Sequence, residues 1–222
     1  MLSSAGIGEG DLVVEVGCGT GRLTLPLAAS TRARVVGVDA EERMLDVARS
    51  KDSSGRVEWM RGSAYRMPLA NGVANLVVMA MVVHLLRQRV RAFREARRIL
   101  RPGGQLNVWT FTPRHVEGSY LNTYFPSIAE IDRPRFPAVE VLSTELRRAG
   151  FSKVVVEIRQ ESRQLAIAEV VDRVRGRYIS TLSMLPPLEY RLGLQRLEEM
   201  LAENPELTVT QRSELAILTA EN

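Results

Sequence analysis

The stretch that decides the fold is VVEVGCGTGRLTLPLA, which runs from Val13 to Ala28. An apolar run containing an acid, Glu15, leads into the glycine-rich segment 17–21, and an amphipathic stretch follows. Glycine tolerates positive φ angles and allows a ligand to approach the backbone closely. The free N–H groups at the start of the following helix favour a carboxylate or a phosphate. The stretch therefore predicts a strand, a tight turn and a helix that together form a ligand site.

A second stretch, VVGVDAEERML, places Asp39 at the end of the next apolar run. Asp39 lies 18 residues after Gly21, close to the spacing of about 20 at which nucleotide-binding folds place an acid on the ribose hydroxyls. The glycine spacing is GxGxG, whereas dinucleotide folds use GxGxxG. Glu15, two residues before the first glycine, would repel a pyrophosphate. It suits a ligand with an ammonium group, such as S-adenosylmethionine (SAM).

Runs rich in Val and Ile alternate with amphipathic stretches along the chain, which is typical of βαβ units and a parallel sheet. The 222 residues suit one α/β domain of the Rossmann-like kind. Pro26 is expected to kink or delay the first helix. The segment 102–104, Pro-Gly-Gly, is expected to interrupt the chain before the fifth strand. The expected strands are 12–16, 34–38, 57–61, 76–79, 105–110, 153–158 and one within 213–219, and the expected helices are 22–30, 41–50, 90–100 and 144–149.

Two segments, 112–137 and 164–205, do not fit the alternation. The first carries four prolines, and the second predicts two or three helices around Pro186. Insertions on a rigid scaffold commonly carry binding function, so we expect these two to form a substrate and lid region. In the first insertion, His115, Tyr120 and Tyr124 are expected either to contact substrate or to pack internally.

Composition excludes several classes of protein. The net charge is +4, and 28 of the 30 basic residues are arginine. No apolar run approaches the roughly 18 residues needed to span a bilayer, and the first residues lack the features of a signal peptide, so a cytoplasmic protein is expected. One cysteine and two histidines predict neither a disulfide framework nor a metal site.

Four stretches resemble successive motifs of the class I SAM-dependent methyltransferases. They are VEVGCGTGRLTLPLA, VVGVDAEERMLDVAR, MPLANGVANLVVMAMVVHLL and REARRILRPGGQLNVWTF, and the resemblance covers about residues 11–160. More narrowly, they are similar to the small-molecule branch that includes the ubiquinone and menaquinone biosynthesis enzymes. The resemblance implies a seven-stranded, mostly parallel sheet whose last strand is antiparallel. It also implies SAM as the methyl donor and S-adenosylhomocysteine (SAH) as the product.

The resemblance also implies a set of cofactor-binding residues, called the cofactor set below. Glycine-turn residues would line the methionine moiety, Glu15 would face its ammonium group, and Asp39 would bind both ribose hydroxyls. Ala40 and Met44 would border the adenine, and Met79 and Ala80 would present backbone to the methionine part. The cofactor set is Glu15, Gly17, Cys18, Gly19, Asp39, Ala40, Met44, Ser63, Ala64, Met79 and Ala80.

The chain departs from the family pattern in two places. Ser63 stands where the family usually has an aspartate that accepts a hydrogen bond from the adenine amino group, so weaker adenine binding is expected. Only eleven residues precede the first expected strand, where the family usually has an N-terminal helix over the cofactor. The chain is truncated, its start is misassigned, or the second insertion supplies the lid.

Several single residues allow two interpretations. Cys18 suits a crowded turn because it is small, although a thiol is also a nucleophile. Met79 and Met81 would contact the cofactor or fill the core. His84 follows the fourth strand, where the methyl acceptor lies in this fold. It would be a base or hydrogen-bond partner for the acceptor, or a structural histidine at a helix start.

The leading function is transfer of a methyl group from SAM to an O, N or C atom of a small molecule. The sulfonium is already activated, so the protein mainly positions the nucleophile, with His84 as the candidate base. The alternatives are an RNA methyltransferase and a non-catalytic SAM-binding protein. The sequence specifies neither the acceptor nor the oligomeric state.

Residues 87–101 hold seven arginines and one acid, Glu95, and could in principle contact phosphates. Four apolar residues at helical spacing, Leu86, Val90, Phe93 and Leu100, are expected to face the sheet. Glu95 is expected to pair with Arg91 and Arg98. The segment after the fourth strand lacks the motifs of adenine-amino and base-C5 methylation, so nucleic acid is not the expected partner. The arginines expected to form an exposed outer face are Arg87, Arg91, Arg94, Arg98 and Arg101.

Overall fold

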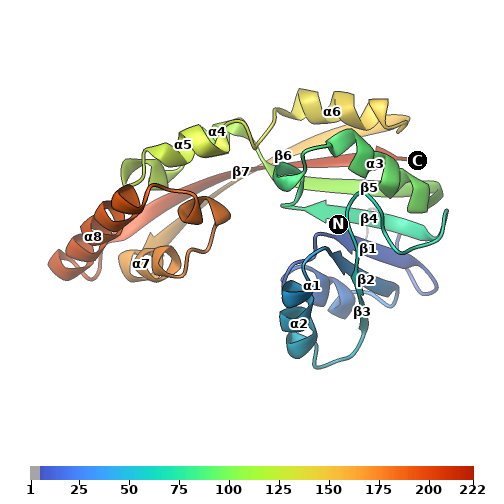
Figure 1. Ribbon diagram of the computed structural model, residues 1–222, viewed down its shortest axis with the longest axis horizontal. Helices are drawn as coiled ribbons and strands as arrows, with labels where there is room; N and C mark the ends of the chain where they lie inside the picture. Colours follow the sequence, from blue (N-terminus) through green and yellow to red (C-terminus); the bar gives the residue numbers. More distant parts are fainter. Residues whose placement is uncertain (1–5) are drawn as a thin grey trace. The chain divides into compact units, whose positions relative to one another are not determined.

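A computed structural model describes residues 6–222 of the chain, which form a seven-stranded sheet flanked by helices (Figure 1). The strand order is β3-β2-β1-β4-β5-β7-β6. The strands are β1 (Leu12–Val16), β2 (Arg34–Asp39), β3 (Val57–Arg61), β4 (Ala74–Ala80), β5 (Leu100–Phe111), β6 (Lys153–Ala166) and β7 (Thr208–Glu221).

Six strands run parallel and the last, β7, runs antiparallel, as the family resemblance implies. β1 pairs in parallel with both β2 and β4, and the next strands outward, β3 and β5, continue the parallel arrangement. The direction of β7 follows from its two ends. Asn222, just after β7, donates its N–H to Gly104 early in β5, whereas Thr112, just after β5, donates its N–H to Glu214 midway along β7.

The central strands are fully buried because their side chains are apolar on both faces. On one face, Val14 and Val16 of β1 pack with α3 (Arg89–Ile99) and α6 (Val139–Arg148). On the other face, Val13 packs with α1 (Thr24–Ala29). The second helix, α2 (Glu42–Lys51), buries Leu45 and Ala48, and a short 3₁₀ turn, η2 (Val83–Leu85), follows β4. Hydrophobic burial on both faces thus fixes the sheet as a rigid platform.

Every expected strand and helix is present, and several differ in extent from the prediction. Helix α1 starts at Thr24, consistent with a start delayed by Pro26. Helix α6 begins five residues before the expected Thr144. Strands β6 and β7 are longer than expected, since polar residues continue them beyond their apolar stretches. The prediction that Pro102–Gly104 interrupts the chain before the fifth strand was wrong, because these residues lie within β5. They form an irregularity between two paired positions, at which Leu100 lies opposite Ala74 and Gln105 lies opposite Leu76. Gly103 makes this possible with a φ of 75°.

The chain divides into two compact units. Among the described residues, unit 1 comprises 6–110, 139–157 and 216–222, and unit 2 comprises 111–138 and 158–215. Both predicted insertions fall within unit 2, which has its own apolar core of residues such as Phe125, Val170 and Leu197. Its helical elements are α4 (Pro113–Glu117), η3 (Tyr120–Thr123), α5 (Ser127–Asp132), α7 (Ile167–Arg175), η4 (Ser180–Ser183) and α8 (Pro187–Glu203).

Candidate functional site

The glycine turn between β1 and α1 lies at the carboxyl end of β1, where the strand order reverses and open α/β sheets bind ligands. Gly17, Gly19 and Gly21 have φ angles of 71°, 53° and 76°, in the left-handed region. A Cβ on Gly17 would come within 2.5 Å of Val82, and one on Gly21 within 2.8 Å of Trp59. A Cβ on Gly19 would meet no heavy atom within 4 Å. Two glycines are thus required by packing, and the third leaves open space beside the backbone.

Asp39, at the end of β2, ties this turn to the neighbouring loop. One carboxylate oxygen, Oδ2, accepts the N–H of Gly19 at 2.7 Å, and the other, Oδ1, accepts the N–H of Glu41 at 2.9 Å. The carbonyl oxygen of Val38 also accepts the N–H of Gly17 at 2.7 Å. Asp39 is half-buried, so its carboxylate stays accessible while it is held in place.

Glu15 lies beneath the turn and is almost closed off from solvent, with 3% of its surface exposed. Its Oε2 accepts the hydroxyl proton of Thr24 in α1 at 2.5 Å. Burial raises the pKa of Glu15 to about 7, and the negative charge of Asp39 adds to this effect, while the Thr24 hydrogen bond opposes it. The Glu15 carboxyl group therefore changes its charge near neutral pH, and a cation nearby would favour the ionised form.

Cys18 has the environment of a packing residue rather than of a nucleophile. Its side chain is buried, and burial followed by the charges of Glu15 and Asp39 raises the pKa of the thiol to about 12. A thiol of this pKa is protonated at neutral pH and is unreactive. Sγ also lies 3.1 Å from the place that a Cβ on Gly37 would occupy, so the turn and β2 are closely packed here.

The residues expected at the adenine lie on α2 and on the loop after β3. Ala40 is exposed, and Met44 presents a large apolar side chain with 44% of its surface exposed. Ser63 and Ala64 are half-buried, and Ser63 Oγ accepts the N–H of Tyr65 at 3.1 Å. The loop is joined to the Asp39 end of β2, because Gly62 donates its N–H to the Asp39 carbonyl oxygen at 2.9 Å.

At the end of β4 the two methionines have different roles. The Met79 side chain is fully buried in the core between the sheet, α3 and α6, so its backbone alone is left for a ligand. Met81 has a φ of 54°, which is unusual for a residue with a side chain and marks a strained backbone. Its N–H donates to the Trp109 carbonyl oxygen at 2.9 Å. The strained turn lies directly after Ala80.

His84 is half-buried in η2, four residues after Ala80. The other expected contact residues belong to unit 2 and not to unit 1, which holds the cofactor set. His115 stacks on Phe111 with 3.8 Å between ring centroids, and burial lowers the pKa of its imidazole. Tyr120 places its hydroxyl 3.4 Å from that of Tyr178.

Two residues that shape the site were absent from the sequence prediction. Thr24 is the hydrogen-bond partner of Glu15, and Trp59 packs its ring against both Gly21 and Gly37. Trp59 lies directly opposite Gly37 in the β2–β3 pairing. A glycine inside a strand is a known signal of close approach, so Gly37 could have pointed to a large neighbour but not to its identity.

The arginine-rich segment around α3 is partly engaged in internal pairs. The apolar residues expected to face the sheet are confirmed: Phe93 and Leu100 are buried, and Leu86 and Val90 pack against the core. The expectation that Arg98 is solvated was wrong, because it binds Glu95 and the loop after β3. These contacts form because α3 packs beside that loop.

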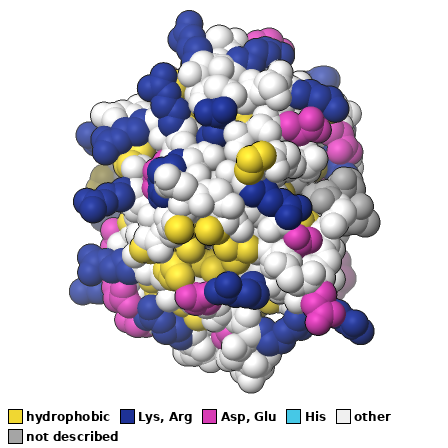
Figure 2. Space-filling view, turned by 90° about the vertical axis from the view of Figure 1, so that its right-hand side faces the viewer, with side chains coloured by type: hydrophobic (Ala, Val, Ile, Leu, Met, Phe, Trp, Pro, Cys, Tyr) yellow, Lys and Arg dark blue, Asp and Glu magenta, His cyan; other side chains and the backbone are white. Residues whose placement is uncertain are grey.

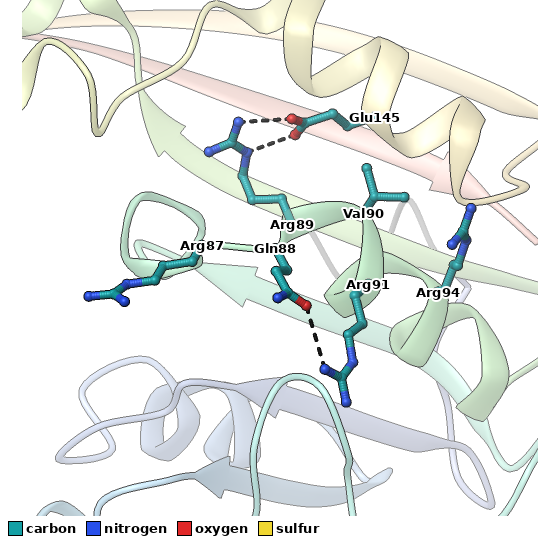
Figure 3. A pocket seen from close by; sticks show the side chains of 7 residues that line it. All are labelled: Arg87, Gln88, Arg89, Val90, Arg91, Arg94 and Glu145. Carbon is teal, nitrogen blue, oxygen red and sulfur yellow. Dashed lines mark hydrogen bonds and ion pairs between the residues drawn. The ribbon is translucent and has the colours of Figure 1, made fainter.

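A hollow of about 340 Å³ lies beside the start of α3 (Figure 3). Arg89 is bound by both oxygens of Glu145, at 2.7 and 2.8 Å. Figure 3 shows that the side chains of Arg87, Arg91 and Arg94 point in different directions and do not converge. On the face drawn in Figure 2, Lys and Arg side chains are scattered, with Asp and Glu side chains among them. This distribution lacks the continuous basic stripe typical of a nucleic-acid site.

The doubly wound sheet, the glycine turn after β1 and the acid after β2 define a nucleotide-type ligand site. Residues 13–104 match the family described as methyltransferase domain. The chain is 30% identical to an O-methyltransferase of Penicillium expansum over 163 residues, which cover 70% of this chain and 57% of the relative. It is 35% identical to a ubiquinone/menaquinone biosynthesis C-methyltransferase of Syntrophotalea carbinolica over 114 residues, 50% of this chain and 47% of the relative.

Among solved structures, a phosphoethanolamine N-methyltransferase of Haemonchus contortus in complex with SAM has the same fold. Its TM-score is 0.63 at 18% identity, over 97% of this chain and 49% of that one. The chain is similar to class I SAM-dependent methyltransferases in its methyltransferase-domain stretch and in its fold. The family uses SAM as its methyl donor. The chain spans about half of the length of the relatives that it matches in sequence. None of the helices within residues 6–222 is long and apolar enough to cross a membrane.

The pKa of Glu15 predicts a pH dependence of SAH affinity. An ammonium group of SAH placed beside Glu15 would favour the ionised carboxylate, so the affinity is expected to fall as pH drops below about 7. We expect calorimetry to show SAH binding about tenfold tighter at pH 7.5 than at pH 5.5, since proton release by one group can change affinity by up to about tenfold per pH unit. Glu15→Gln should make the affinity nearly constant over this range.

The control is His84→Gln, which removes the imidazole four residues after Ala80 and should leave the slope intact. An equal slope in wild type and Glu15→Gln would show that another group causes the pH dependence.

Proposed function

We propose that this chain binds SAM through the cofactor set and transfers its methyl group to an O, N or C atom of a small-molecule acceptor. The observation that carries the proposal is the Asp39 carboxylate, which is held at the glycine turn and remains half-exposed. Each carboxylate oxygen can accept more than one hydrogen bond, so the hydroxyls of a ribose can donate to Asp39 while the N–H groups of Gly19 and Glu41 hold it in place.

The residues present suit SAM in particular. The open space at Gly19 leaves room for the methionine moiety beside the backbone, and Met44 offers apolar surface for the adenine. Glu15 and Asp39 place negative charge around the turn, which favours a ligand with ammonium and sulfonium groups over an anionic dinucleotide.

When bound, SAM supplies a methyl group on a positively charged sulfur, which is already activated for transfer. The protein contributes position: the strained turn at Met81 fixes the backbone that follows β4, and rigid strands hold the ends of the cofactor site. His84, just beyond this turn, accepts the proton of a phenolic or acidic acceptor.

We also propose that unit 2, which contains both insertions, supplies the substrate and lid region. The chain enters unit 2 directly after Thr110, at the carboxyl end of β5, the end at which this fold binds its ligands. A small-molecule acceptor fits the proposal better than RNA, because Arg89 and Arg98 are occupied by Glu145 and Glu95.

Removal of the Asp39 carboxylate should weaken the cofactor. We expect Asp39→Ala to reduce SAH binding by about 1.5–3 kcal/mol, the scale of hydrogen bonds to a charged group, in calorimetry. The control is Asp46→Ala, which removes an exposed acid from α2. Wild-type protein that binds neither SAM nor SAH would contradict the proposed function, whereas unchanged binding by Asp39→Ala would contradict the ribose contact alone.

The role of His84 is tested by turnover. With an identified acceptor, His84→Gln should lower kcat by about 10²-fold, the usual scale of general base catalysis, and should leave SAH affinity unchanged. Near-normal turnover in this variant would assign His84 a structural role.

Hydrogen exchange tests the role of unit 2. Addition of SAH, with or without acceptor, should slow amide exchange in segments 112–137 and 164–205, since a lid exchanges more slowly when ligand closes it. A chain in which only unit 1 gains protection would contradict a lid in unit 2.

A further inference from the structure

The loop of residues 62–71, between β3 and β4, carries Ser63 and Ala64 of the cofactor set but has few bonds of its own. Ser63 and Arg66 exchange backbone hydrogen bonds of 3.3 and 2.9 Å. A Cβ on Gly62 would lie 2.6 Å from Pro68, so the loop folds back tightly on its own start. The remainder of the loop takes its conformation from a neighbouring element.

That element is α3, through Glu95 and Arg98. Glu95 Oε1 accepts the N–H of Met67 at 2.6 Å. The Arg98 guanidinium donates to the carbonyl oxygens of Met67 and Leu69, at 3.2 and 2.8 Å, and to Asn71 Oδ1 at 2.7 Å. One ion pair thus binds three backbone groups and one side chain of the loop.

The pair is well formed for this task. The two side chains join through two hydrogen bonds of 2.7 and 2.8 Å, and are 13% and 33% exposed. The bond from Arg98 lowers the pKa of Glu95, and the bond from Glu95 raises the pKa of Arg98, so both stay charged at neutral pH. Hydrogen bonds of charged groups are the strong ones in proteins.

The other side of α3 is fixed to the sheet by Phe93, Ala96 and Ile99, which are fully buried. Met67 is buried in the same core. The loop is therefore held to a rigid helix at one end and to β2 at the other, where Gly62 binds the Asp39 carbonyl oxygen. Ser63 and Ala64 lie between these two attachments.

We propose that Glu95 and Arg98 are positioning residues for the adenine of the cofactor. They hold the loop so that Ser63 and Ala64 present their polar groups to the edge of the base that carries the amino group. This inference rests on the proposed function, because it assumes that SAM occupies the site. It assigns to the Glu95–Arg98 ion pair a positioning role that requires no contact with the ligand.

The test measures discrimination between two ligands rather than affinity alone. S-inosylhomocysteine differs from SAH in having a carbonyl in place of the adenine amino group, with a proton on the adjacent ring nitrogen. Wild type should bind SAH more tightly than this analogue in calorimetry. Arg98→Gln should reduce that preference by about tenfold, the loss expected from one or two misplaced hydrogen bonds.

Arg89→Gln is the matched control. Arg89 lies on the same helix and forms a similarly buried, two-bond pair with Glu145, but no bond from Arg89 to the loop is present among residues 6–222. This variant should lose stability and keep the wild-type ratio of the two affinities. Equal loss of preference in Arg89→Gln and Arg98→Gln would overturn the proposal in favour of general loosening of α3.

Glu95→Gln is a second variant for the same measurement, and it tests the proposal if Arg98→Gln does not fold. It retains the shape and an acceptor for Met67, and should reduce the preference by about threefold through the loss of charge. An unchanged preference in Glu95→Gln, or a wild type that binds both ligands equally, would overturn the inference while the proposed function stands. Wild type that binds no SAH would overturn both.

Discussion

The site depends on a turn that contains three glycines. This turn is required because β1 pairs in parallel with both β2 and β4. β1 ends between two strands that point the same way, so the chain must reverse direction within a few residues to enter α1. Three positive φ angles accomplish this, and Val82 and Trp59 fill the space where side chains would otherwise lie. The same geometry leaves Gly19 open and aims its N–H at Asp39.

This arrangement places two carboxyl groups, those of Glu15 and Asp39, around the turn, and the helix that follows offsets little of their negative charge. Helix α1 is only six residues long, so the positive end of its dipole offsets little of this negative charge. Burial raises the pKa of Glu15 to about 7, so near neutral pH this carboxyl group is present in both its charged and its neutral form. A ligand with positive charge would stabilise the ionised carboxylate of Glu15, whereas a pyrophosphate would be repelled by it. The electrostatics of the turn thus agree with the cofactor that the family uses.

Helix α3 shows how a single element can serve the core and the site. Its apolar face joins the core, while its charged residues divide into pairs with different targets. Arg89 binds Glu145 of α6 and fixes one helix to the other, whereas Arg98 and Glu95 reach the loop before β4. The arginine content of this segment would by itself indicate a phosphate-binding surface. Arg89 and Arg98 instead connect α3 to neighbouring elements of the fold.

The sequence by itself determined the fold class and the positions of Glu15, the glycines and Asp39. These features depend on local rules: alternation of apolar runs, the φ angles that only glycine adopts freely, and an acid at a fixed distance along the chain. The extents of β6 and β7 were predicted too short, because their polar residues are strand residues only when a neighbouring strand pairs with them.

Tertiary structure alone decided which partners these residues meet. Thr24 meets Glu15, Trp59 meets Gly37, and Arg98 meets the carbonyl oxygens of a loop about thirty residues earlier in the chain. Such contacts depend on the register of neighbouring strands and on the packing of helices against them. No periodicity within a segment encodes them. The same reason separates the two methionines after β4: sequence places Met79 and Met81 two residues apart, but packing buries the first and strains the backbone of the second.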